Sequence, residues 1–156
     1  MATLFAIAAF EVRARLKRLS TWVYFAVFFA LTFLWTLAAG GAFQNANIIF
    51  GSGKVWINSP YAIAQSTALL GMIGATVIAA LFGRAVQQDF EYRTEPFFFA
   101  APIRKWQYLG GRYVGALVVL LVVFASIALG GFLGTLWPGL DPDRLGPPRV
   151  AAYLAP

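Results

Sequence analysis

The residues of this chain that could do chemistry are few, and their types suit recognition better than catalysis. The sequence contains no His and no Cys, which removes the commonest metal ligand, the commonest general base and every thiolate. It also lacks the G-x-x-x-x-G-K-[ST] loop that cradles nucleotide phosphates. We therefore expect no enzyme activity in this chain, no metal site and no cofactor.

The side chains best suited to recognition gather between residues 84 and 112, where charged residues alternate with Phe, Tyr and Trp. Buried aromatic and Arg side chains dominate the energetics of protein interfaces. Thr94 to Pro96 suits the start of a short helix, and a second short helix is expected after Pro102, ending at Gly110-Gly111. The candidate contact residues are Phe97, Phe98, Phe99, Arg104, Lys105, Trp106 and Arg112. Docking on a protein and resting on anionic lipid both stay open.

The elements that must position this segment are predicted to be membrane helices. Hydrophobic residues make up 60% of the chain and charged residues only 12%, against about 25% charge in a soluble domain. Three stretches carry no charge at all, and each exceeds the roughly 20 residues that span a bilayer. Hydrocarbon offers backbone groups no partner, so these stretches should be helical. We predict an all-α integral membrane protein with transmembrane helices at 20–43, 61–83 and 113–137.

The distribution of Lys and Arg predicts the orientation of these helices. Most of the twelve lie before the first span or between the second and third, and the others are Lys54, Arg144 and Arg149. Cytoplasmic flanks carry the excess of positive charge. The N-terminus and residues 84–112 should therefore be cytoplasmic, with 44–60 an external loop and 138–156 an external tail. Because the charge flanks apolar runs, we expect it to serve membrane topology and not nucleic-acid binding.

Residues 1–19 are predicted to form an amphipathic helix at the membrane interface. Apolar residues recur at helical spacing, and charged ones, among them Glu11, Arg15 and Lys17, lie elsewhere on the helical wheel. The alternative is a charged N-terminal stretch that ends at the lipid headgroups.

Small residues recur every four positions in the second and third predicted spans. Such stripes allow helices to approach closely. The residues expected to mediate helix packing are Gly71, Ala75, Ala79, Gly83, Gly111, Gly115, Gly130 and Gly134.

The order of these features resembles the permease subunits of bacterial type 2 ATP-binding cassette exporters. The resemblance covers nearly the whole chain and is strongest over residues 58–65, over D-x-E-x-x-T at Asp89 to Thr94, and over P-I-R-K-x-x-Y-L-x-G-R at Pro102 to Arg112. It implies that residues 84–112 form a coupling loop for a cytoplasmic nucleotide-binding ATPase, which adds Glu91 and Thr94 to the docking residues. It also implies a second permease half or a second copy as partner, contacts with membrane lipids, and a bacterial cytoplasmic membrane.

The chain also departs from that family. The likeness is greatest to permeases fused to a zinc aminopeptidase-like region, whose H-E-x-x-H signature cannot exist in a sequence without His. Permeases of this family have more spans in each half, so we expect a fragment or a subunit that needs partners. A membrane scaffold without a transport cycle stays open as an alternative. An intramembrane enzyme is disfavoured because the predicted spans hold only neutral polar groups such as Gln65 and Ser126.

Overall fold

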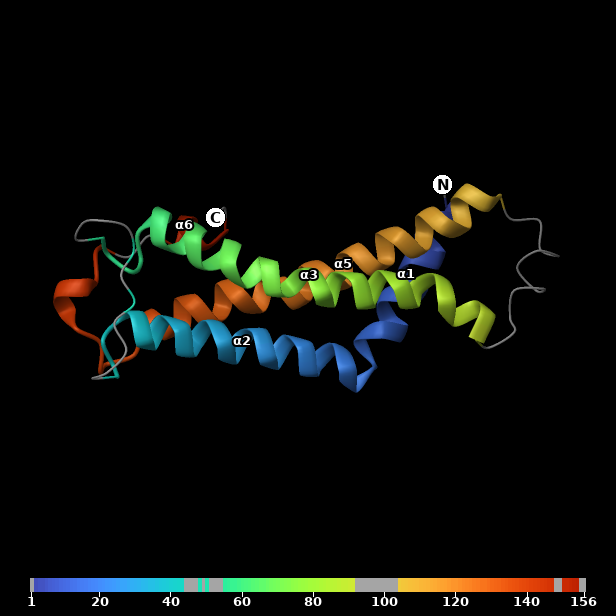
Figure 1. The fold of residues 1–156 in the computed structure, drawn as a ribbon. Coiled ribbons are helices and arrows are strands. Elements are labelled where there is room, and N and C mark those ends of the chain that lie inside the picture. Colours follow the sequence, from blue (N-terminus) through green and yellow to red (C-terminus); the bar gives the residue numbers. More distant parts are fainter. Residues whose placement is uncertain are drawn as a thin grey trace. The chain divides into compact units, whose positions relative to one another are not determined.

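Helices make up all the regular structure in the described part of the chain. The computed structural model describes residues 2–43, 48, 50, 55–91, 104–147 and 150–154. Its elements, in chain order (Figure 1), are α1 (Ala2–Leu16), α2 (Leu19–Ala39), α3 (Pro60–Glu91), α5 (Lys105–Thr135), the 3-10 helix η1 (Pro142–Arg144) and α6 (Ala151–Leu154). The prediction of an all-helical chain is confirmed.

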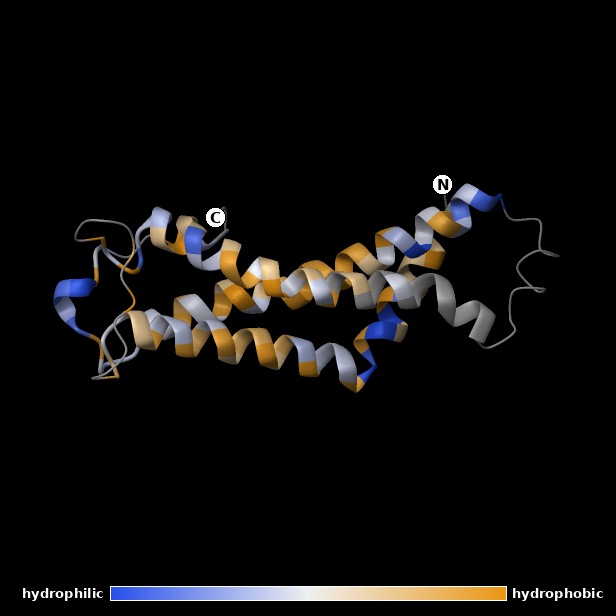
Figure 2. Ribbon diagram, in the orientation of Figure 1, coloured by the Kyte–Doolittle hydropathy of each residue, from blue (hydrophilic) through white to orange (hydrophobic). Residues whose placement is uncertain are grey.

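Two of these helices, α2 and α5, are long and apolar enough to cross a membrane, as judged over the described residues. Hydrophobic residues run along both helices (Figure 2). Two such helices fit a membrane protein. The third predicted span, 61–83, lies within α3; that α3 also crosses the membrane stays a prediction.

Helices α3 and α5 both extend into residues 84–112, which the sequence predicts to be a loop. Helix α3 continues past Gly83 to Glu91, and α5 begins at Lys105 instead of Tyr113. The prediction that Gly110-Gly111 ends a separate short helix is wrong, because α5 passes through both glycines unbroken. A Cβ on Gly111 would lie only 2.9 Å from the carbonyl oxygen of Leu4. These glycines therefore accommodate a neighbouring helix and do not end their own.

The chain divides into two compact units, which are described separately. Unit 1 comprises Met1–Tyr24 and Gly74–Val123. Its core lies where α1 packs on the first half of α5, and Ala8, Ala116, Val119 and Val123 are buried there. The turn from α1 into α2 is fixed by side chains that cover the last carbonyls of α1. The Thr21 hydroxyl donates to the Arg15 carbonyl and the Trp22 indole donates to the Leu16 carbonyl, each at 2.8 Å.

Unit 2 comprises Phe25–Ile73 and Phe124–Pro156. Here α2 packs on the second half of α5 through Gly130, where an added Cβ would lie 2.6 Å from the Phe29 carbonyl oxygen. The Trp35 indole donates a hydrogen bond of 3.0 Å to the Ser66 hydroxyl and so links α2 to α3. Helices in lipid are usually joined in these two ways: small residues let the backbones approach closely, and polar side chains form hydrogen bonds between helices.

The segment before α3 and the segment after α5 contact each other at one end of unit 2. The Asn58 side chain accepts from the Gly146 amide at 2.8 Å and donates to the Gly146 carbonyl at 2.6 Å. The Ile57 amide donates to the Arg144 carbonyl at 3.0 Å, and Leu140 lies in an apolar cluster with Leu37. We call this arrangement, Val55 to Ser59 together with Leu140 to Pro147, the cap.

The end of the tail also folds back in unit 2. The ring of Tyr153 in α6 meets Phe132 edge-on, with centroids 5.6 Å apart. Burial raises the pKa of Tyr153 above its ordinary 10.0, partly offset by a hydrogen bond with Thr135.

Candidate functional site

The described parts of the predicted docking segment are the end of α3 and the start of α5 with Arg104 before it. Arg104, Lys105 and Trp106 are exposed there, with 49% of Trp106 accessible. Arg112 is half-buried, and its guanidinium carbon lies 5.2 Å above the centre of the Tyr108 ring. Such a cation–π contact orients the guanidinium while leaving its charge in place. Glu91 is the last residue of α3.

Some of the predicted docking residues cannot be placed. Thr94, Phe97, Phe98 and Phe99 lie outside the described residues. Their role in docking stays a prediction.

An apolar face accompanies the basic residues at the start of α5. Trp106, Leu109 and Tyr113 follow one another at helical spacing and are 49%, 54% and 58% exposed. Residues three and four apart lie on one face of a helix. An aromatic and aliphatic surface bordered by Arg104 and Lys105 has the composition typical of a protein interface.

The opposite face of the same helical turns is held by α1. A Cβ on Gly111 would lie 2.9 Å from Ile7, and a Cβ on Gly115 would lie 2.7 Å from the Cβ of Glu11. A Cβ contact under 3.0 Å is essentially never seen, so glycine is required for this approach. The first turns of α5 thus pack against α1 on one face and expose Trp106, Leu109 and Tyr113 on the other.

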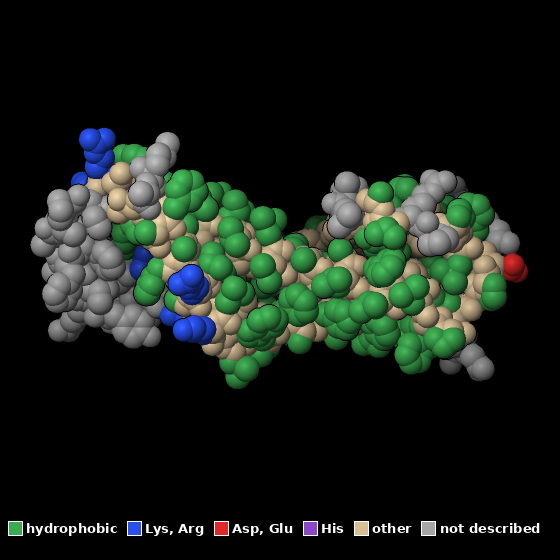
Figure 3. Space-filling view, turned by 180° about the vertical axis from the view of Figure 1, so that it is seen from behind, with side chains coloured by type: hydrophobic (Ala, Val, Ile, Leu, Met, Phe, Trp, Pro, Cys, Tyr) green, Lys and Arg blue, Asp and Glu red, His purple; other side chains and the backbone are tan. Residues whose placement is uncertain are grey.

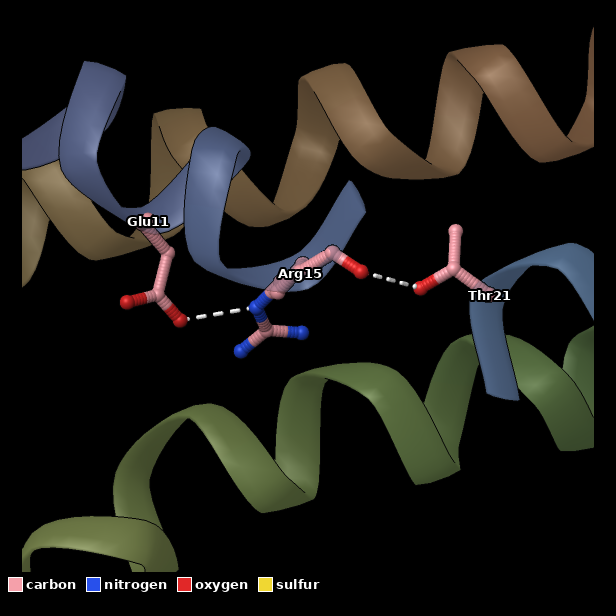
Figure 4. A network of polar contacts seen from close by, with 3 residues as sticks. All are labelled: Glu11, Arg15 and Thr21. Atoms are coloured by element: carbon pink, nitrogen blue, oxygen red, sulfur yellow. Dashed lines mark hydrogen bonds and ion pairs between the residues drawn. The ribbon is translucent and has the colours of Figure 1, made fainter. Parts of the chain in front are cut away.

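The sequence interpretation missed a buried ion pair beside this contact. Arg15 Nε donates to Glu11 Oε1 at 2.7 Å, and both side chains are only 7% exposed (Figure 4). The prediction that both residues lie away from the apolar residues on the helical wheel is wrong: they lie on the buried face of α1, together with Ala8. The available signal was the spacing of Glu11 and Arg15 at i and i+4, in register with Leu4 and Ala8.

Burial makes this pair energetically demanding. Moving two charges out of water costs several kcal/mol per ion unless they meet each other in good geometry. The 2.7 Å contact supplies that geometry. Because both residues lie on α1, the pair itself would survive a rotation of the helix; the face is held inward by the packing of Glu11 and Ala8 against Gly115.

The predicted packing residues fall into two groups. Gly111, Gly115, Gly130 and Gly134 each lie against another helix, since a Cβ there would meet an atom of that helix within 3.0 Å. Gly71 and Gly83 have nothing within 4 Å of the corresponding position, and Ala75 and Ala79 are exposed. That the stripe on α3 packs on a neighbour stays a prediction.

The described residues offer recognition chemistry at this site. Among them, no cluster of three or more His, Cys, Asp or Glu side chains could hold a metal ion. The start of α5 exposes an aromatic and basic surface, and the opposite face of the same turns packs against α1. Comparison with protein-family models, curated proteins and solved structures finds no match for this chain.

Proposed function

We propose that this chain is a permease component of an ATP-binding cassette exporter in a bacterial cytoplasmic membrane. In this proposal a separate cytoplasmic ATPase docks on residues 84–112, and a second copy or second permease half completes the transport path. One observation carries the proposal. The exposed Lys105 and Trp106 begin the same unbroken helix that contains an apolar stretch long enough to cross a membrane.

In this proposal the continuous helix is the mechanical link between the docking surface and the membrane span. Its backbone hydrogen bonds repeat at every residue, so its length changes little when one end is pushed. In α5 these bonds run from Lys105 to Thr135, through the glycines that were expected to interrupt them. The contact of α1 with Gly111 and Gly115 adds a second element that would move with the docking end.

The division of labour in this proposal follows from the chemistry of the sequence. ATP binding and hydrolysis belong to the partner, because this chain has no phosphate-binding loop. The role of this chain is mechanical: it receives a displacement at Arg104 to Trp106 and changes the arrangement of its membrane helices. A scaffold that merely binds an ATPase would show the docking without the mechanical step.

The chain offers a matched pair of variants to test docking. Trp106 lies in the first turn of α5 and Trp137 lies two residues beyond its end, and they are 49% and 50% exposed. We expect Trp106→Asp to weaken capture of the ATPase encoded beside this chain by at least about 30-fold, the equivalent of roughly 2 kcal/mol for an interface anchor. Trp137→Asp should leave capture unchanged, because Trp137 is expected on the external side.

The same variants separate a permease from a scaffold. If the chain is a permease, it should stimulate the partner's ATP hydrolysis, and loss of docking should abolish that stimulation. Docking that is lost with no change in hydrolysis favours the scaffold. Equal capture by both variants, and by Phe98→Asp in the aromatic run, would contradict the docking assignment.

A further inference from the structure

We propose that the outer face of α1 and the turn into α2 bind the headgroups of anionic phospholipids. The site consists of Arg13, Lys17 and Arg18, with Phe10, Leu19 and Trp22 as its apolar border. It does not depend on the proposed ATPase docking, which concerns the start of α5.

The inward-facing ion pair determines which cations remain available. Glu11 is the only acidic residue before Asp89, and it pairs with Arg15. Arg13 lies two residues from both, so the helical repeat of 3.6 residues turns it to the opposite face. Arg13 and Lys17 are exposed and Arg18 is partly exposed. Among the described residues, no acidic side chain forms an ion pair with any of the three.

Large hydrophobic side chains border these cations. Phe10 is 71% exposed, Leu19 is 79% exposed and Trp22 is 51% exposed. Trp22 is also held in place, because its indole nitrogen donates to the Leu16 carbonyl at 2.8 Å. On the face drawn in Figure 3, Lys and Arg side chains of unit 1 border hydrophobic side chains. Cations and a fixed Trp beside exposed apolar residues are the composition of a membrane–water boundary.

Charge complementarity identifies the ligand. Three cations that form no ion pair within the described part of the chain would gain little from a zwitterionic headgroup, whose own positive group offsets the phosphate. An anionic headgroup carries an uncompensated phosphate, which guanidinium groups bind through paired hydrogen bonds. Phe10, Leu19 and Trp22 would meanwhile enter the acyl-chain boundary. These features favour phosphatidylglycerol or a related anionic lipid over phosphatidylcholine.

The experiment uses the full chain in nanodiscs that contain equal amounts of phosphatidylglycerol and phosphatidylcholine. The readout is the ratio of the two lipids retained by the protein, measured by native mass spectrometry. Wild-type protein should prefer phosphatidylglycerol, and the preference should fall as salt is raised. Arg13→Gln, Lys17→Gln and Arg18→Gln should each reduce it by up to about fivefold, the gain typical of one cation near an anionic surface.

A control variant of equal charge shows whether the position of the cations matters. Lys54→Glu together with Arg149→Gln lowers the net charge by three, as the triple variant of the proposed site does, and neither residue belongs to this site or to the proposed docking residues. The control should retain most of the preference and the triple variant should lose it. Equal losses would overturn the site, because they would reflect net charge alone. A triple variant that keeps its lipid preference but fails to capture the ATPase would also overturn it, since the cations would then serve a protein partner.

Discussion

Glu11 on α1 packs directly against α5 at Gly115, where the Cβ that glycine lacks would lie 2.7 Å from the Cβ of Glu11. The carbonyl oxygen of Ala8 is 3.0 Å from the same point. A charged residue that the helical wheel separates from the apolar residues therefore lies at a close contact between two helices. Several consequences of this arrangement can be measured.

The first prediction compares Gly115→Ala with Gly71→Ala. A methyl group at position 115 has no room, so overpacking should destabilise the protein by about 1–3 kcal/mol. A methyl group at position 71 meets nothing within 4 Å. It should be neutral or stabilising by about 0.5–1 kcal/mol, because alanine favours the helix. Denaturant unfolding of the full chain in detergent measures both.

The Gly71 variant also tests the stripe on α3. In the isolated chain Gly71→Leu should be tolerated, because its position is open. If α3 packs on a second copy or permease half, Gly71→Leu should reduce recovery of the assembled complex while leaving the stability of the single chain unchanged. Gly130→Leu should instead destabilise the chain itself, since the Phe29 carbonyl lies against that position.

The second prediction concerns the Glu11–Arg15 pair. Arg15→Met removes the cation and leaves a buried carboxylate, which should cost about 3–5 kcal/mol of stability. Replacing both residues, as in Glu11→Leu with Arg15→Met, should cost less than the single change, because an apolar pair leaves no buried charge. Exposed Arg13→Met is the control and should change stability by less than about 0.5 kcal/mol. A double variant less stable than Arg15→Met would contradict this account.

The third prediction concerns the cap. Asn58→Ala leaves the amide and the carbonyl of Gly146 without their side-chain partner, which should cost about 1–3 kcal/mol locally. Trypsin should then cut more readily after Arg144, which lies next to this contact. If the cap opens and closes faster than cleavage, the initial rate should rise by roughly 5- to 150-fold. Asp143→Ala, at an exposed position in η1, is the control and should cleave like the wild type.

The fourth prediction concerns topology and uses the absence of Cys from the natural sequence. Lys105→Cys places a single thiol at the exposed start of α5, and Asp143→Cys places one at an exposed position beyond its other end. In intact cells a membrane-impermeant maleimide should label position 143 and should label position 105 only after the membrane is opened. The reverse pattern would invert the orientation and place the docking segment outside the cell, away from any cytoplasmic ATPase.

The helical fold, and the two helices that are long and apolar enough for a membrane, could be predicted from the sequence alone. These features depend on local properties: long uncharged runs fix the helices, because only a helix satisfies its own backbone in lipid. The aromatic and basic composition around Trp106 was equally visible without coordinates. The ends of the helices were harder to predict, since α3 continues to Glu91 and α5 begins at Lys105, where α1 packs against its first turns.

The roles of several glycines and charges became clear only from their contacts in the fold. Gly110-Gly111 has the composition of a helix end, but contact with α1 makes it the interior of α5, because close packing outweighs the weak helix propensity of glycine. Glu11 and Arg15 have the composition of surface charges, but both are buried on the face of α1 that packs against α5. Asn58 looked like part of a connector, yet it bonds to Gly146 across most of the chain. Local sequence encodes propensity and polarity, whereas the choice of neighbour depends on residues that are distant in sequence and meet only in the fold.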